Sequence, residues 1–143
     1  MIDPVVPDPI LSGAPALYPR IELSELFQIA QHPDSIAWTP FRPGVEIHRL
    51  YGDGRSGPTA ALLRFRTAAE IPLHRHAGYE HILVLAGSQR DQNGPAGPGT
   101  LVINPPGTVH RVEAEPGCVV LAIYEKPVEF LEPPAPLSVS SSP

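Results

Sequence analysis

Three histidines and one glutamate occur at spacings that suit a metal site. His74 and His76 stand at positions i and i+2, which point to the same face of a β-strand. Glu80 opens the next apolar run, and we expect its carboxylate to meet both histidines across a hairpin. His110 follows the turn sequence at 105–107 and begins a further strand. Together, the four side chains predict one mononuclear metal centre.

Imidazole and carboxylate ligands of this kind bind several divalent metals, namely zinc, iron, manganese, nickel and copper, without strong discrimination. Three neutral imidazoles and one carboxylate would leave a divalent ion with a net charge of about +1, which favours an anionic or enolate oxygen as a further ligand. An octahedral ion would keep open positions for water, for a bidentate substrate, or for a substrate with O₂. A tetrahedral zinc would keep none and would be structural.

Short strand-like segments separated by glycine and proline must position these ligands. We count seven to nine such segments, and no helical pattern of ten residues interrupts them. The pattern predicts an all-β fold of two antiparallel sheets, either a sandwich or a barrel. The clearest segments are 45–51, 59–66, 81–86, 99–104, 109–113 and 118–124.

The distribution of proline divides the chain of 143 residues, whose length favours a single domain. Of 20 prolines, eight lie in residues 1–43 and four in residues 132–143. Because an interior proline breaks a helix, this content excludes a helical bundle. We expect a proline-rich N-terminal arm at 1–35, one domain at 36–131, and a flexible tail at 132–143.

One short helix is predicted within the arm. Leu23, Leu26, Phe27 and Ala30 have the i, i+3, i+4, i+7 spacing of an apolar helix face.

Composition limits the partners and the compartment. Ten basic residues stand against fifteen acidic ones, giving a net charge of −5, and no basic run exists to neutralise phosphates, so we expect no nucleic-acid partner. No apolar stretch approaches the roughly 20 residues that span a bilayer, so we expect no membrane partner. Cys118 is the single cysteine and no leader pattern is present, which is typical of a cytoplasmic protein. We expect Cys118 to be a buried small hydrophobe.

Four other positions have alternative roles. Tyr79, Arg64 and Arg66 could line a pocket and bind an anionic substrate, although edge or interface roles are more common for such residues. His81 follows Glu80 and is therefore expected on the opposite face of its strand, away from the metal.

The ligand spacings resemble the first motif of the cupin superfamily, G-x5-H-x-H-x3,4-E-x6-G. His74, His76, Glu80 and Gly87 occupy four of its five fixed positions, and Ala68 replaces the leading glycine.

The second cupin motif, G-x5-P-x-G-x2-H-x3-N, is similar to the later part of the chain. Gly99, Pro105, Gly107 and His110 match it, and Ala114 replaces the asparagine. The resemblance implies an RmlC-like jelly-roll barrel, called a cupin double-stranded β-helix, with the four motif residues as metal ligands.

Within the cupins, the sequence looks most like the cupin domain of ChrR-type anti-sigma factors, over about residues 36–131. The segments that carry this likeness are 38–45 and the two motifs. In that family the cupin domain binds zinc and responds to the signal, whereas a separate helical domain, with a zinc site of histidine and cysteines, inhibits the sigma factor. The first 43 residues here are proline-rich and lack cysteine, so the resemblance gives no support to direct sigma-factor binding.

The resemblance leaves two main functions open. The first is a stand-alone ChrR-like binding module whose metal responds to a small molecule or an oxidant. The second is an Fe²⁺-dependent dioxygenase acting on a diketone or phenolic substrate, and a metal-dependent isomerase or lyase is a weaker third. We also expect a homodimer, because single-domain cupins are usually dimers and the apolar arm suits a neighbour's sheet.

Overall fold

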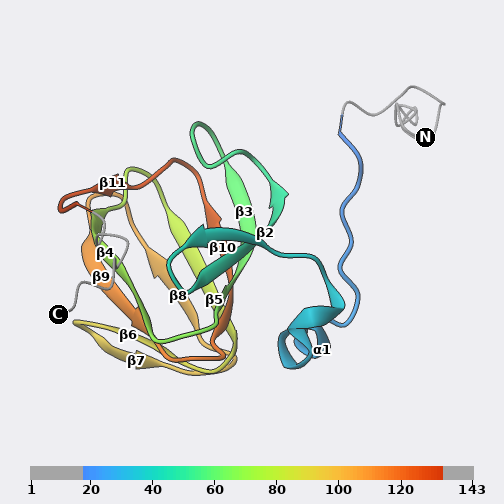
Figure 1. The fold of residues 1–143 in the computed structure, drawn as a ribbon. Helices are drawn as coiled ribbons and strands as arrows, with labels where there is room; N and C mark the ends of the chain where they lie inside the picture. Colours follow the sequence, from blue (N-terminus) through green and yellow to red (C-terminus); the bar gives the residue numbers. More distant parts are fainter. Residues whose placement is uncertain (1–17, 134–143) are drawn as a thin grey trace, which may run out of the picture.

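The structure is a computed structural model that describes residues 18–133, and it consists of two antiparallel sheets (Figure 1). The larger sheet has six strands in the order β1-β2-β3-β10-β5-β8. These are β1 (Thr39–Arg42), β2 (Val45–Tyr51), β3 (Thr59–Phe65), β10 (Val119–Tyr124), β5 (Glu80–Ala86) and β8 (Leu101–Asn104).

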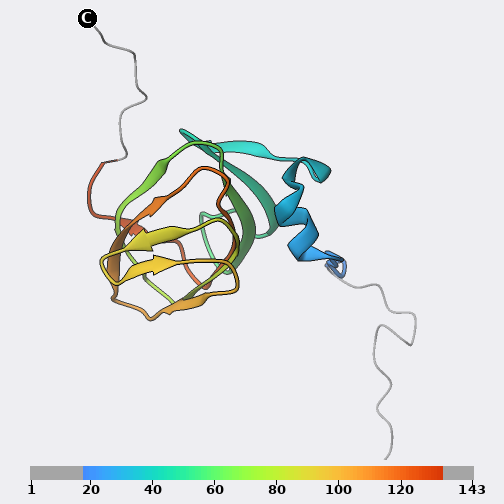
Figure 2. The same cartoon turned by 90° about the horizontal axis from the view of Figure 1, so that it is seen from below.

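The smaller sheet has five strands in the order β11-β4-β9-β6-β7. Seen from below, the two sheets curve around a common interior (Figure 2). The strands are β11 (Glu129–Phe130), β4 (Ala69–Arg75), β9 (Val109–Ala114), β6 (Gln89–Asp91) and β7 (Gly94–Ala96).

This architecture confirms the predicted all-β, double-sheet fold. The described residues contain eleven strands rather than seven to nine. The additional strands are two to four residues long, too short to show an alternating pattern in the sequence. The edge strand β1, for example, lies in the segment 38–44, which showed no strand pattern, and it pairs with β2.

Apolar side chains from both sheets fill part of the interior. Phe65, Val84 and Val120 are each at most 2% exposed and belong to this core. Cys118 lies in the same cluster and is fully buried, as its sequence context predicted. Burying such side chains contributes about 1.5–3 kcal/mol each to folding.

A second apolar cluster lies on the outer face of the six-stranded sheet. There the helix α1 (Leu26–Gln31) and the 3₁₀ turn η1 (Pro33–Ser35) lie beside the barrel (Figure 1). Ala30 packs with Leu62, Leu85 and Val119, so α1 seals a sheet face that would otherwise be exposed to water.

The helical segment buries the predicted face except at Phe27, since Leu23, Leu26 and Ala30 all pack in this cluster. Its buried side passes through Leu26, Ile29 and Ala30, whereas Phe27 is 62% exposed. Glu25 has a left-handed backbone (φ 57°), so the helical period begins at Leu26 and turns Phe27 outwards.

About half of the predicted arm and nearly all of the predicted tail, namely residues 1–17 and 134–143, lie outside the described residues. In the described part of the chain, no helix has the length and apolar character needed to cross a membrane.

Candidate metal centre

The four predicted ligands come from both sheets and meet in the barrel interior. His74 is the penultimate residue of β4 and lies opposite His110 of β9 in the strand register. His76 directly follows β4. Glu80 is the first residue of β5, which belongs to the other sheet.

The predicted hairpin between the histidines and Glu80 is therefore wrong. β4 and β5 do not pair, because the chain crosses from the five-stranded to the six-stranded sheet between them. Glu80 reaches the histidines across the interior instead. The alternation of apolar and polar residues shows which side chains share a face within one strand. It does not show whether the next strand joins the same sheet, so the sequence could not reveal this crossing.

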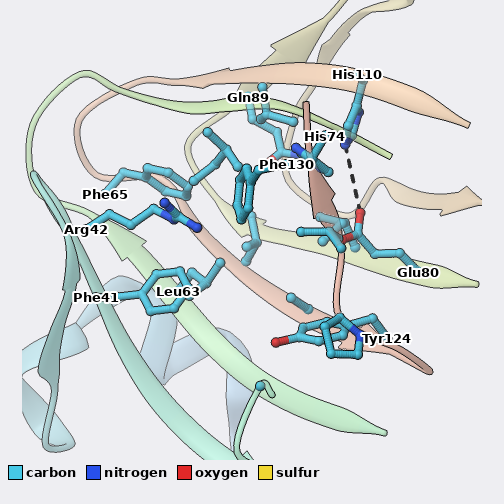
Figure 3. Close-up of a pocket in the computed structure, with 18 of the residues that line it drawn as sticks. Phe41, Arg42, Leu63, Phe65, His74, Glu80, Gln89, His110, Tyr124 and Phe130 are labelled. Atoms are coloured by element: carbon cyan, nitrogen blue, oxygen red, sulfur yellow. Dashed lines mark ion pairs between the residues drawn. The ribbon is translucent and has the colours of Figure 1, made fainter. Parts of the chain in front are cut away.

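The site is compact and buried. His74, His76, Glu80 and His110 are between 1% and 8% exposed, and one ligand atom from each lies within 4.8 Å of the others. The Oε1 atom of Glu80 is 3.1 Å from Nε2 of His76 and 4.0 Å from Nε2 of His110, the pair marked in Figure 3. These four residues could hold one metal ion.

A tight turn holds His76 in position. Gly107, with φ 89°, donates its N–H to the carbonyl of His76 at 2.8 Å, and His76 donates back to the carbonyl of Thr108 at 2.9 Å. This is the turn at Pro105–Gly107 that the sequence placed before His110. A residue with a Cβ rarely adopts the left-handed φ of Gly107.

Hydrogen bonds at Nδ1 orient the imidazole rings. Nδ1 of His74 lies 2.7 Å from the carbonyl oxygen of Pro72, and Nδ1 of His76 lies 2.9 Å from the hydroxyl of Thr108. Nδ1 of His110 lies 2.9 Å from a carboxylate oxygen of Asp91. With Nδ1 donating in each ring, Nε2 is left as a lone-pair donor, as in metal sites whose histidines are held by outer partners.

Two of these Nε2 atoms have no hydrogen-bond partner. Nε2 of His76 and Nε2 of His110 are buried, and among the described residues neither makes a hydrogen bond of acceptable geometry. A buried polar atom left unpaired costs about 1–3 kcal/mol. A metal ion would satisfy both atoms, so the donor set fits the predicted centre.

The electrostatics favour the protonation states that bind a metal. Burial lowers the pKa of His74, so the neutral imidazole predominates. Burial raises the pKa of Glu80, but the neighbouring imidazoles of His76 and His74 and the amide of Asn104, at 3.1 Å, lower it, and the net pKa is lowered. A neutral imidazole and an ionised carboxylate are the forms that act as ligands.

A cavity of about 230 Å³ adjoins the four residues. Three of them, His74, Glu80 and His110, form part of its wall, and most of the remaining lining is apolar. Of the other polar side chains in the lining, Arg42 lies away from the histidines, as Figure 3 shows, whereas Tyr124 stands opposite Glu80 in the strand register. Arg49 and Gln89 complete the polar part of the lining. The centre is therefore next to a space that can admit a small ligand.

The three residues considered for an anion pocket, Tyr79, Arg64 and Arg66, do not line this cavity. Arg64 pairs with Glu46 at 2.7 Å and with Asp34 at 2.8 Å, and Arg66 reaches Glu46 at 3.4 Å. Because Leu63 and Phe65 of β3 point inwards, Arg64 points outwards.

Tyr79 is 45% exposed and, like Arg64 and Arg66, is not among the described residues that line the cavity. The alternative in which these three residues form an anion pocket is therefore not supported, and the edge or interface roles that are more common for such residues fit better.

Sequence reasoning missed the residues that support the ligands and the far wall of the cavity. Asp91, Asn104 and Arg42 stand in separate strands and carry no spacing signal. Thr108 could have been found, since it lies in the turn two residues before His110.

Comparisons with known proteins agree with this architecture. A family model described as "ChrR Cupin-like domain" matches residues 27–129. A crystal structure of an RmlC-like cupin protein from Ralstonia eutropha JMP134 is 25% identical, covers 67% of each chain and has a TM-score of 0.59. No curated protein sequence gives a significant match.

Two further solved structures are similar. A chain in the crystal structure of Rhodobacter sphaeroides SigE in complex with the anti-sigma ChrR is 26% identical, covering 87% of this chain and 70% of that one, with a TM-score of 0.60. An acetylacetone dioxygenase from Acinetobacter johnsonii is 12% identical, covering 92% of this chain and 85% of that one, with a TM-score of 0.63. At 12% identity the likeness concerns the fold alone.

Proposed function

The chain belongs to the ChrR Cupin-like domain family, and we propose that it is a mononuclear metal-binding module that responds to a small molecule or an oxidant. The observation that carries this proposal is the buried set of three histidines and one glutamate, two of whose nitrogens lack partners, beside a cavity. A divalent ion held there would supply Lewis acidity towards an anionic oxygen.

The residues around the site are suited to sensing. Asp91 and Thr108 fix two of the imidazoles, while the apolar cavity wall keeps bulk water from the ligands. A ligand or oxidant that disturbs one imidazole therefore acts on strand β6 or on the 105–108 turn through these hydrogen bonds. The sigma factor in the ChrR complex is a partner of that protein, and we do not propose one for this chain.

A second candidate is an Fe²⁺-dependent dioxygenase acting on a diketone or phenolic compound. The observation in its favour is that the cavity reaches three of the four ligand residues, so a substrate could lie directly against the centre. A purely structural zinc site would need no such access.

Metal analysis followed by an oxygen-uptake screen separates the two candidates. We would purify the protein without oxygen, measure its zinc, iron, manganese and nickel content, and then record O₂ consumption with acetylacetone and with catechol. The sensory proposal predicts bound metal, and no sustained uptake even after loading with Fe²⁺. Sustained uptake that requires Fe²⁺ would replace it with the dioxygenase, and failure to bind any of these metals would overturn both.

A further inference from the structure

Arg42 projects into the cavity at the end away from the histidines. It is the last residue of the edge strand β1. Its guanidinium carbon lies 4.4 Å from the ring centroid of Phe130 and 5.2 Å from that of Phe41. Figure 3 shows the guanidinium between these two rings, facing the interior. Cation–π contacts with both rings hold the side chain in this position.

The charge of Arg42 has no anionic partner in the described part of the chain. Its Nε atom is buried without a hydrogen bond. The other arginine of the cavity lining, Arg49, is exposed to solvent, and Arg64, Arg75 and Arg111 each pair with a carboxylate. Burial lowers the pKa of Arg42, and the opposing influence comes from the Tyr124 hydroxyl. A partly desolvated cation without a partner is costly, and a bound anion would recover that cost.

The rest of the cavity defines what such an anion must be. Its wall is largely apolar, with Leu63, Ile82 and Val112 among the lining residues. Its volume of about 230 Å³ is below the roughly 300–1,000 Å³ of pockets for drug-sized ligands. Since a divalent ion on three imidazoles and one carboxylate is also net positive, both polar ends of the cavity attract negative charge.

We infer that Arg42 is the anion-binding residue of this cavity, and that the ligand is a small organic carboxylate with an apolar body. The inference rests on the proposed function in taking this cavity as the ligand site. The planar guanidinium can donate two parallel hydrogen bonds to a carboxylate. The stacked rings fix its plane, which a lysine ammonium could not reproduce.

A matched pair of probes tests the inference. Benzoate and its neutral isostere benzamide would be titrated calorimetrically into the zinc-loaded protein and into Arg42→Met, which keeps the aliphatic packing against Phe130 and Phe41. Arg66→Met, on the outer face, serves as the control. Zinc content and thermal midpoint would be measured for every variant, so that loss of the metal site is separated from loss of the anion site.

We expect wild type and Arg66→Met to bind benzoate about tenfold or more tightly than benzamide, and Arg42→Met to lose this preference while keeping its zinc. A preference for benzoate that persists in Arg42→Met would place the anion on the metal and overturn the inference. Equal binding of the two probes to the wild type, or binding of neither with zinc present, would overturn it too, while leaving the metal-binding proposal intact.

Discussion

At the scale of the residue, each histidine of the centre uses its two ring nitrogens differently. One nitrogen of His110 bonds to Asp91, and the other faces Glu80 without a hydrogen-bond partner. A carboxylate behind an imidazole fixes its tautomer and raises its basicity as a ligand. Asp91 suits this role, since its pKa, which burial raises, is lowered overall by the hydrogen bond to His110.

Replacing Asp91 should therefore weaken metal binding without removing a ligand. We expect Asp91→Asn to lower zinc affinity about 10–100-fold, because the amide neither polarises nor orients His110 as the carboxylate does. Competition with a chelator of known affinity would measure this change. Glu113→Gln, at an exposed position of β9, the strand that carries His110, is the control. Equal zinc affinity of Asp91→Asn and Glu113→Gln would show that Asp91 does not support the metal centre.

Cys118 should be chemically inert in the folded protein. It is fully buried, and burial raises the pKa of its thiol to about 12. Because the thiolate is the reactive form, we expect no reaction with a disulfide reagent at pH 8 until denaturant is added. Rapid labelling of the native protein would mean that this part of the core is open, and would make Cys118 a candidate redox group.

At the scale of the element, the outer face of the six-stranded sheet is fastened to the α1–η1 segment by ionic as well as apolar contacts. Arg64 of β3 connects Glu46 of β2 with Asp34 of η1 and lies under Trp38, with its guanidinium carbon 5.0 Å from that ring. The pKa of each of the two carboxyls is lowered by its hydrogen bond to Arg64.

The sign of the resulting pH dependence follows from these lowered pKa values. The two ion pairs with Arg64 contribute fully to the free energy of unfolding above the ordinary carboxyl pKa values, 3.8 for Asp34 and 4.5 for Glu46. Their contribution is lost as the pH falls through the lower pKa values of the folded protein. We expect Glu46→Gln to lower the thermal midpoint slightly at pH 7 and to make it fall less steeply below about pH 4. Identical melting curves for variant and wild type across this range would contradict the prediction.

What the sequence could reveal depends on how local each signal was. The spacing of His74, His76 and Glu80 identified three candidate ligands, because all three lie within seven consecutive residues. Other features of the site depend on which strands become neighbours. They are the crossing from β4 to β5, the pairing of Asp91 with His110, and the position of Arg42. That arrangement is set by packing of the whole barrel, which no short pattern encodes.

At the scale of the whole molecule, the described residues leave one sheet face incompletely covered. α1 packs over the part of the outer face near β3, but Leu101 and Ile103 of β8 remain 55% and 49% exposed, and Ile123 of β10 is 36% exposed. The strand register places Ile123 and Ile103 on either side of His81, so all three share one face. β8 is also an edge strand, which favours association with another chain.

We therefore propose a homodimer through this face. Light scattering after size exclusion should give about twice the chain mass of 15.4 kDa, and Ile103→Lys should shift the protein towards the monomer because it puts a charge into the apolar contact. Phe27→Lys, on the exposed side of α1, is the matched control. A monodisperse wild-type species of 15.4 kDa would refute the dimer.

The central claim is that His74, His76, Glu80 and His110 form one metal centre, and metal content after a single ligand is removed tests it most directly. We would compare zinc bound per chain, by mass spectrometric elemental analysis, in wild type, His76→Ala and His81→Ala, the last being a neighbouring histidine outside the site. We predict about one zinc per chain in wild type and in His81→Ala, and a sharp loss in His76→Ala. Unchanged zinc in a folded His76→Ala protein would contradict the assignment.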